Sequence, residues 1–224
     1  MRSLPGVNPG PAGVVRGPRP AAAGWLVGGW VFLLASLGCS AGGKRVAPPD
    51  FSPEDAAKQA MATYDKNGDG ALDAKELEQC PPLKSALKSF DKNGDGRIST
   101  AELIERFNFY KESEVGLNGI SLQVMLDNQP LEGAQVTFVP EKFLGSGIKP
   151  ATGVSDAQGV VDLSTEGEDV PGVHCGLFRV EVSKKGPGGK ELLPARYNTR
   201  TVLGCEVAPG RRGAGEYEFR LTSR

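Results

Sequence analysis

The spacing of hydrophobic residues changes once along the chain, near residue 115. Before this point apolar residues recur every three or four positions, which is typical of helices with one buried face. After it apolar and polar residues alternate, which is typical of strands with one buried face. The pattern therefore predicts an α+β protein of two domains, with helices over residues 51–112 and strands over residues 117–224.

The helical part predicts four amphipathic segments. The first begins after Ser52, because Ser52 can cap a helix, Pro53 suits the first helical position and two acids follow. The second starts at Asp73 and must stop by Cys80, since two prolines come next. The apolar residues expected in the core are Ala57, Ala60, Met61 and Tyr64 in the first segment, Leu83, Ala86, Leu87 and Phe90 in the third, and Leu103, Ile104, Phe107 and Tyr110 in the fourth.

Two polar strings of twelve residues, 65–76 and 91–102, separate these segments. Both have Asp at positions 1 and 5, Asn at position 3, Gly at position 6 and Glu at position 12. They resemble the calcium loop of EF hands, and the resemblance covers roughly residues 50–112. It implies two bound Ca²⁺ ions, because calcium takes six to eight hard oxygen ligands. The implied ligands are Asp65, Asn67, Asp69, the carbonyl of Ala71, Asp73 and Glu76 in loop one, and Asp91, Asn93, Asp95, the carbonyl of Arg97, Ser99 and Glu102 in loop two.

The remaining loop positions agree with this interpretation. Gly70 and Gly96 stand where a sharp turn is needed. Leu72 and Ile98 are expected to point into the core and to pair the loops through a short strand bridge. A dockerin module has similar loops and is the alternative, but dockerins have no incoming helix and typically have Asp at position 12.

The second part predicts about seven short strands, a number that fits a β-sandwich. They are expected at residues 120–126, 134–138, 177–182, 201–207 and 216–221, with a hairpin at 154–163 about a turn at 156–159. The strings 129–138, 153–159, 170–172 and 194–198 resemble transthyretin-like, carboxypeptidase-regulatory-like modules. The resemblance implies an immunoglobulin-like antiparallel sandwich that acts as a non-catalytic spacer or adhesion module. Enzymatic relatives use several histidines and a C-terminal Tyr-Arg-Gly-Ser; this chain has only His174 and ends differently, so we expect no enzyme.

The N-terminal segment is typical of an export signal. A 13-residue uncharged apolar run at 25–37 fits the hydrophobic region of a signal peptide and is short for a spanning helix. Small residues then precede Cys39, which resembles a bacterial lipoprotein signal in which Cys39 becomes the lipidated N-terminus. Ser36 departs from the preferred Leu, and ordinary secretory cleavage after Gly38 is the alternative. The expected organisation is a signal peptide at 1–38 and a flexible tether at 39–50.

Composition narrows the chemistry further. The 224 residues carry 26 basic and 27 acidic side chains, a net charge of -1, which excludes a general polyanion binder such as a nucleic-acid protein. A single histidine excludes sites that need several. Export would place Cys80, Cys175 and Cys205 in an oxidising compartment, where Cys175 and Cys205 could form a disulfide. Three buried thiols are the alternative.

These patterns together predict a calcium-binding, exported and lipid-anchored protein of the cell envelope, in the periplasm or at the outer membrane. Its expected partners are calcium, the membrane through the lipid, and an envelope protein or glycan, with no nucleic acid. The main alternative is an adhesion or carbohydrate-binding module in which calcium only stiffens the stalk.

Overall fold

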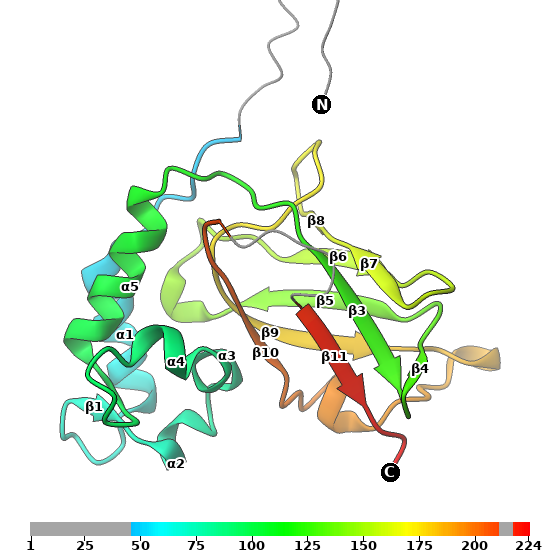
Figure 1. The fold of residues 1–224 in the computed structure, drawn as a ribbon, viewed down its shortest axis with the longest axis horizontal. Helices are drawn as coiled ribbons and strands as arrows, with labels where there is room; N and C mark the ends of the chain where they lie inside the picture. Colours follow the sequence, from blue (N-terminus) through cyan, green and yellow to red (C-terminus); the bar gives the residue numbers. More distant parts are fainter. Residues whose placement is uncertain (1–45, 211–216) are drawn as a thin grey trace, which may run out of the picture. The chain divides into compact units, whose positions relative to one another are not determined.

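The computed structural model describes residues 46–210 and 217–224, and they belong to one compact unit (Figure 1). The expected signal peptide and the lipidation site Cys39 lie outside the described residues. Within the described part of the chain, no helix combines the length and hydropathy needed to cross a bilayer.

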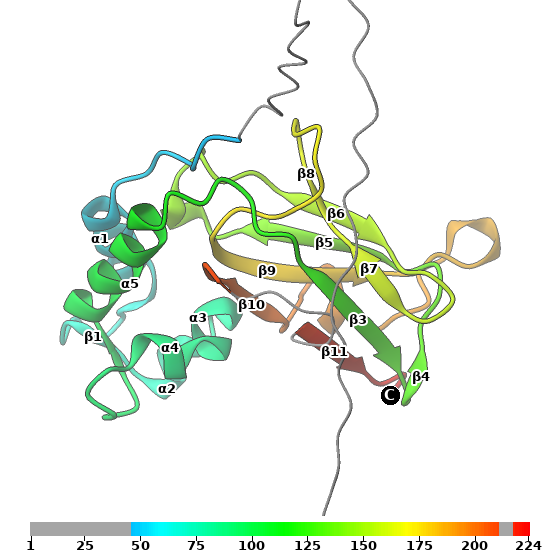
Figure 2. The ribbon, with the colours of Figure 1, turned by 45° about the horizontal axis from the view of Figure 1, so that its top comes forward.

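The helical part follows the predicted order. It comprises α1 (Pro53–Tyr64), β1 (Ala71–Leu72), α2 (Ala74–Leu77), α3 (Pro81–Ser85), α4 (Leu87–Phe90), β2 (Ile98–Ser99) and α5 (Thr100–Glu112). Ser52 caps α1 as expected, accepting a hydrogen bond from the Asp55 amide. The core includes Phe90 and Phe107, which pack edge to face with ring centroids 5.9 Å apart. The first and last helices, α1 and α5, pack against each other (Figure 2).

The third predicted helix is divided in two. Its backbone leaves the helical region at Ala86, where φ is -95° and ψ is 5°, between α3 and α4. The two prolines that end the second segment also begin α3, because their fixed φ suits the first turn of a helix, where no N–H donor is required. The predicted apolar face survives the break, since Leu83, Ala86 and Phe90 are all buried.

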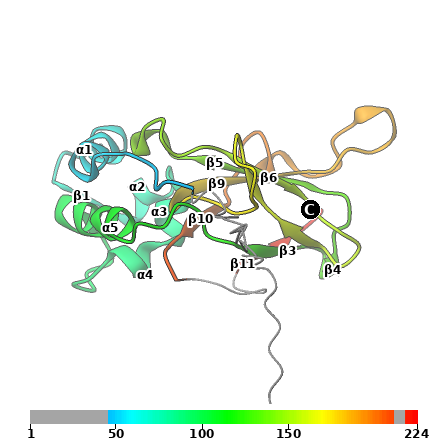
Figure 3. The same cartoon turned by 90° about the horizontal axis from the view of Figure 1, so that it is seen from above.

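The β part forms two sheets that pack face to face (Figure 3). One sheet has the order β10-β9-β5-β6-β8, and in the other β3 pairs with β11, β4 and β7. Phe138 of β5 and Phe219 of β11 meet between the sheets, with ring centroids 6.3 Å apart. The elements are β3 (Ser121–Leu126), β4 (Gln129–Pro130), β5 (Gln135–Pro140), η1 (Lys142–Leu144), β6 (Ala151–Val154), β7 (Val160–Asp162), β8 (Ser164–Thr165), β9 (Gly176–Ser183), η2 (Pro187–Gly189), η3 (Ala195–Tyr197), β10 (Gly204–Val207) and β11 (Tyr217–Leu221).

Two details of the predicted sandwich are wrong. The turn at 156–159 forms, but β6 before it pairs with β5 and β7 after it pairs with β3, so the turn crosses between sheets and makes no hairpin. The sandwich is also not fully antiparallel, because β11 runs parallel to β3 over Tyr217–Leu221. Local alternation predicts which residues form strands, but it carries no information on which strand pairs with which.

The Cys175–Cys205 disulfide that the sequence left open is not present. Cys175 is a free thiol whose Sγ lies 3.1 Å from Asn118 Nδ2. Cys205 pairs in register with Phe178 on β9, three residues beyond Cys175. Cys175 directly precedes β9, and the two thiols contact different polar groups, Asn118 for Cys175 and the carbonyl of Glu206 for Cys205.

The end of the expected tether is packed against the β part. A Cβ at Gly116 would meet the carbonyl of Val46, and a Cβ at Gly147 would lie 2.5 Å from the carbonyl of Asp50. These close backbone contacts hold residues 46–50 at the edge of the sandwich.

A buried ion pair joins the helical part to the sandwich. Arg106 on α5 binds Glu206 on β10, with 2.6 Å between Nε and Oε1, and the Tyr110 hydroxyl donates to the same oxygen. Only 3% of the Glu206 side chain is exposed. The helix that leaves loop two is therefore fixed to a strand of the sandwich.

A second polar cluster lies around loop one. Arg179 on β9 binds Glu141, with 2.9 Å between Nε and Oε1, and donates to the carbonyl of Gln79. The Tyr64 hydroxyl donates to Oε2 of Glu141. Since Tyr64 is the last residue of α1 and Gln79 follows α2, both helices that flank loop one are also bound to the sandwich.

Candidate metal centre

The two polar loops are held side by side by a short antiparallel bridge. Leu72 of β1 pairs with Ile98 of β2, and Ala71 pairs with Ser99. Both Leu72 and Ile98 are fully buried, so the bridge is fixed by the core beneath it. The prediction that position 8 of each loop points inward and pairs the loops is confirmed.

The first half of loop one is shaped by its own side chains. Asp65 accepts hydrogen bonds from the amides of Gly68 and Gly70, at 2.7 and 3.0 Å. Asn67 accepts from the amide of Asp69, and Asp69 accepts from that of Ala71. These oxygens therefore lie along the inside of one tight turn, and a carboxylate or amide oxygen with one bonded N–H keeps a second lone pair.

Loop two repeats the arrangement. Asp91 accepts from the amides of Gly94 and Gly96, at 2.6 and 2.8 Å, and Asn93 accepts from that of Asp95. Gly70 and Gly96, at position 6, have φ of 86° and 80°. A side chain would strain this left-handed conformation, which is why glycine is needed there.

The last residue of each loop closes it. Oε1 of Glu76 accepts from the amide of Lys66 at 2.8 Å, and Oε2 accepts from the amide of Asp73 at 3.0 Å. Glu102 does the same in loop two through Lys92 and Ser99. Burial opposes ionisation of Glu102, but these hydrogen bonds prevail and hold its pKa below the ordinary value. Each position-12 carboxylate thus joins the start of its loop to the end.

Position 9 serves as the cap of the outgoing helix in both loops. Asp73 accepts from the amide of Glu76, and Ser99 accepts from the amide of Glu102. Asp73 with Glu76 and Ser99 with Glu102 therefore form a capping box in each loop. The caps fix the direction in which α2 and α5 leave the loops.

The donor set fits a hard divalent cation. Every side-chain donor at the implied ligand positions of both loops is an oxygen, as calcium requires. Among the described residues, however, no group of three or more His, Cys, Asp or Glu side chains is gathered closely enough to hold a metal ion. The carboxylates are directed at the amides of their own loops, so a cation would have to draw them together.

The sequence interpretation missed one side chain in this region. Arg97 was expected to contribute only its carbonyl, at position 7 of loop two. Its guanidinium instead crosses to loop one, where Nη2 lies 2.5 Å from Oδ2 of Asp69 and 3.5 Å from the carbonyl oxygen of Ala71. The hydrogen bond from Arg97 is the main cause that lowers the pKa of Asp69. The loop pattern fixes the backbone role of position 7 and leaves its side chain free, so this contact had no signal in the sequence.

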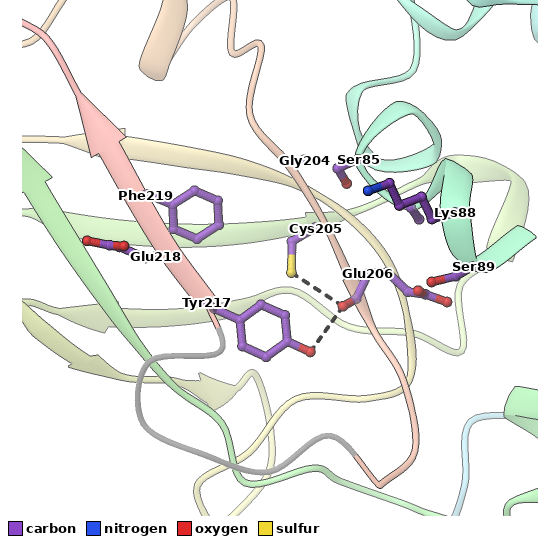
Figure 4. Close-up of a pocket in the computed structure, with 10 residues that line it drawn as sticks. Ser85, Lys88, Ser89, Gly204, Cys205, Glu206, Tyr217, Glu218 and Phe219 are labelled. Atoms are coloured by element: carbon purple, nitrogen blue, oxygen red, sulfur yellow. Dashed lines mark hydrogen bonds between the residues drawn. The ribbon is translucent and has the colours of Figure 1, made fainter. Parts of the chain in front are cut away.

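A separate pocket lies between α3, α4 and the two strands β10 and β11 (Figure 4). Ser85, Lys88 and Ser89 line one side, and Glu206 and Tyr217 line the other. The Tyr217 hydroxyl donates to the backbone carbonyl of Glu206 at 3.1 Å. The pocket belongs to the contact between the helical part and the sandwich and lies apart from both loops.

Comparison with known families agrees with the loop geometry. Residues 58–81 and 83–107 each match the EF hand family model. Each match includes the whole of one twelve-residue loop, and together they support calcium binding by this part of the chain. No curated protein and no solved structure matches the chain. The fold and site thus define a calcium-binding EF-hand pair followed by a β-rich domain.

Proposed function

We propose that the EF-hand pair binds two calcium ions, one in each loop, and that the protein acts in the cell envelope after export. The observation that best supports calcium binding is that two loops of the same construction pair with each other, and that each is closed by a buried Glu at position 12. Asp65, Asn67, Asp69 and Glu76 would hold the ion in loop one, and their counterparts would hold it in loop two. A bound ion neutralises carboxylates that otherwise repel one another.

The roles of the chain's own residues follow from their positions. Asp65 and Asp91 supply a carboxylate at the start of each loop, where Gly70 and Gly96 allow the chain to turn back toward it. Glu76 and Glu102 supply two oxygens each from the outgoing helices. Each ligand set therefore links an incoming helix to an outgoing one, and occupation would stiffen the link.

Calorimetric calcium titration tests the number of sites. We expect two sites in the parent chain, with Glu76→Gln weakening one of them roughly ten-fold or more and Glu102→Gln weakening the other. The matched control is Glu78→Gln, which removes an exposed acid two residues beyond loop one and should leave both sites intact. Absence of heat at millimolar calcium would refute calcium binding, and loss of affinity in the control would show that general charge, and not the loops, attracts the ion.

The proposed anchor is a separate step. The apolar run at 25–37 and the small residues before Cys39 support export and lipidation, and a lipoprotein N-terminus with several acyl chains holds a protein stably at a membrane. Cys39→Ser should then move the protein from the membrane fraction to the soluble periplasmic fraction. A parent protein that is already soluble would contradict the anchor but leave calcium binding unaffected.

The β part is proposed as a non-catalytic interaction or spacer module. Its support is the transthyretin-like pattern of the sequence. The Arg106–Glu206 ion pair and the hydrogen bonds of Tyr64 and Gln79 fix this module to the EF-hand pair. Affinity capture from an envelope extract, with and without chelator, would find a protein partner. A glycan array would find a carbohydrate.

A further inference from the structure

The Arg97 side chain contacts two of the oxygens that loop one would offer to calcium. Its guanidinium contacts Oδ2 of Asp69 and the carbonyl of Ala71, which are positions 5 and 7 of loop one. Its positive charge also interacts with Asp95 of its own loop and with Asp73, at position 9 of loop one, but the hydrogen bonds of the guanidinium go to loop one. One arginine of loop two therefore contacts two of the oxygens that loop one would offer to calcium.

A guanidinium and a calcium ion compete for these oxygens. Each hydrogen bond to Arg97 uses a lone pair that the ion would otherwise receive, and two cations at such short distance repel each other. The contact is not strong, since 38% of the Arg97 side chain and 42% of the Asp69 side chain are exposed. Exposed ion pairs contribute little stability, so the ion can displace Arg97 at a modest cost in affinity.

The hydrogen bonding of the Arg97 side chain in this position is also incomplete. Its Nε is buried and has no hydrogen-bond partner among the described residues. A buried donor without a partner is unfavourable, which lowers the cost of moving the side chain out to solvent. The Arg97 side chain can therefore bind the oxygens of loop one and can also be displaced from them.

The two loops differ in this respect. Position 7 of loop one is Ala71, whose methyl group carries no charge and cannot reach across to loop two. Loop two supplies a competing cation to loop one and receives none from Ala71 in return. The number of carboxylates alone would favour calcium binding in loop one, which has four, over loop two, which has three. The Arg97 contact acts in the opposite direction, because it lowers the affinity of loop one.

We propose that Arg97 is an internal competitor for calcium in loop one, so that loop two fills first and loop one fills only when the guanidinium is displaced. The inference rests on the proposed calcium binding. It makes Arg97 a determinant of site affinity and filling order without being a side-chain ligand.

A calcium titration of the full chain followed by amide NMR tests the filling order. The Gly70 and Gly96 amides are equivalent probes, because each donates to the first Asp of its own loop. In the parent chain the Gly96 signal should reach saturation at lower calcium than the Gly70 signal. Arg97→Gln should tighten loop one about five-fold, near the upper limit for an exposed ion pair, and narrow the gap between the probes. Arg97→Lys should give a smaller change, since it keeps the charge but loses the planar fork.

Lys92→Gln is the matched control, because it removes the same charge from an exposed position of the same loop. It should change loop-one affinity less than Arg97→Gln does. Equal effects of the two variants, an unchanged loop one in Arg97→Gln, or Gly70 saturating first in the parent would each overturn the proposal while leaving calcium binding in place. A chain in which neither probe moves at millimolar calcium would overturn the calcium proposal and this inference together.

Discussion

Arg106 and Glu206 form an ion pair between the EF-hand pair and the sandwich, with 2.6 Å between Nε and Oε1. They lie 100 residues apart in the sequence, and both are largely buried. Arg106 stands four residues after Glu102 on α5, so a residue that closes loop two and a residue that binds the sandwich share one short stretch of helix. We therefore expect a change in the stiffness of loop two to alter the contact between α5 and the sandwich.

Loss of the Glu206 carboxylate should destabilise the whole protein. Glu206→Gln keeps the size of the side chain but leaves the Arg106 guanidinium without a counter-charge in a mostly buried position. Breaking a buried pair on one side costs about 3 kcal/mol in the free energy of unfolding. Urea denaturation measures this loss, and Glu218→Gln is the control, because its pair with Arg220 is exposed and should be worth less than about 1 kcal/mol. Equal losses of unfolding free energy in the two variants would show that burial of the Arg106–Glu206 pair does not increase its contribution to stability.

The close approach of β10 to α3 gives a second prediction. A Cβ at Gly204 would lie 2.2 Å from the carbonyl carbon of Pro81 and from the nitrogen of Pro82. These are backbone atoms that cannot turn away, so Gly204→Ala should cost about 3 kcal/mol, the upper range for an overpacked site. The control is Gly119→Ala, whose Cβ would meet nothing within 4 Å and whose backbone is not left-handed. Thermal unfolding should place the control within about 0.5 kcal/mol of the parent, and a parent-like Gly204→Ala would show that the two parts do not touch at Pro81.

The local features of the fold could be predicted because their causes are local. Ser52 caps α1, the capping boxes form at Asp73 and Ser99, and the loop bridge pairs Leu72 with Ile98, each as spacing and residue type require. The same reasoning failed at the turn at 156–159, which joins different sheets. A turn signal shows where the chain reverses, whereas the choice of sheet depends on packing between residues far apart in sequence.

The contacts between the two parts could not be predicted for the same reason. Glu206 lies among apolar residues of a strand, an unusual place for an acid, and that was the only signal of a buried partner. Nothing local identifies Arg106 as that partner, because the helix pattern assigns charged residues to the exposed face. Arg97 is a similar case, since its target, Asp69, was already assigned to the loop.

Acid should weaken the sandwich through Glu191. Burial opposes ionisation of this carboxylate, but hydrogen bonds from Ser183 and the amide of Leu193 prevail, with help from Lys185, and lower its pKa to about 2. A carboxylate with a lowered folded-state pKa stabilises the protein fully above its ordinary pKa, near 4.5, and loses that effect as the pH falls toward 2. Glu191→Gln should therefore cost about 1–2 kcal/mol at pH 6 and almost nothing at pH 2.

Denaturation of parent and variant across that pH range measures the difference directly. Glu132→Gln, at an exposed position of the same domain, should show a small difference that stays constant with pH. A Glu191→Gln deficit that is independent of pH would contradict the assignment, because it would reflect lost packing and not lost charge.

Calcium should raise the melting temperature of the full chain in a single transition that includes the sandwich. An ion that binds only the folded state adds about 2.7 kcal/mol per site when its concentration is a hundred times the Kd. Both helices around loop one are bound to the sandwich through Glu141 and Arg179, and the helix after loop two is bound through Glu206. We therefore expect the added stability to be shared and not confined to residues 51–112. The melting transitions followed by far-ultraviolet circular dichroism at helix and strand wavelengths should shift together when millimolar calcium replaces a chelator.

The double variant Glu76→Gln with Glu102→Gln is the control. It should melt at nearly the same temperature with calcium and with chelator, because its loops lack the closing ligand. A shift that persists in this double variant would place the ion outside the loops. Separate transitions at the two wavelengths would show that the Arg106–Glu206 ion pair and the hydrogen bonds of Tyr64 and Gln79 do not couple the two parts.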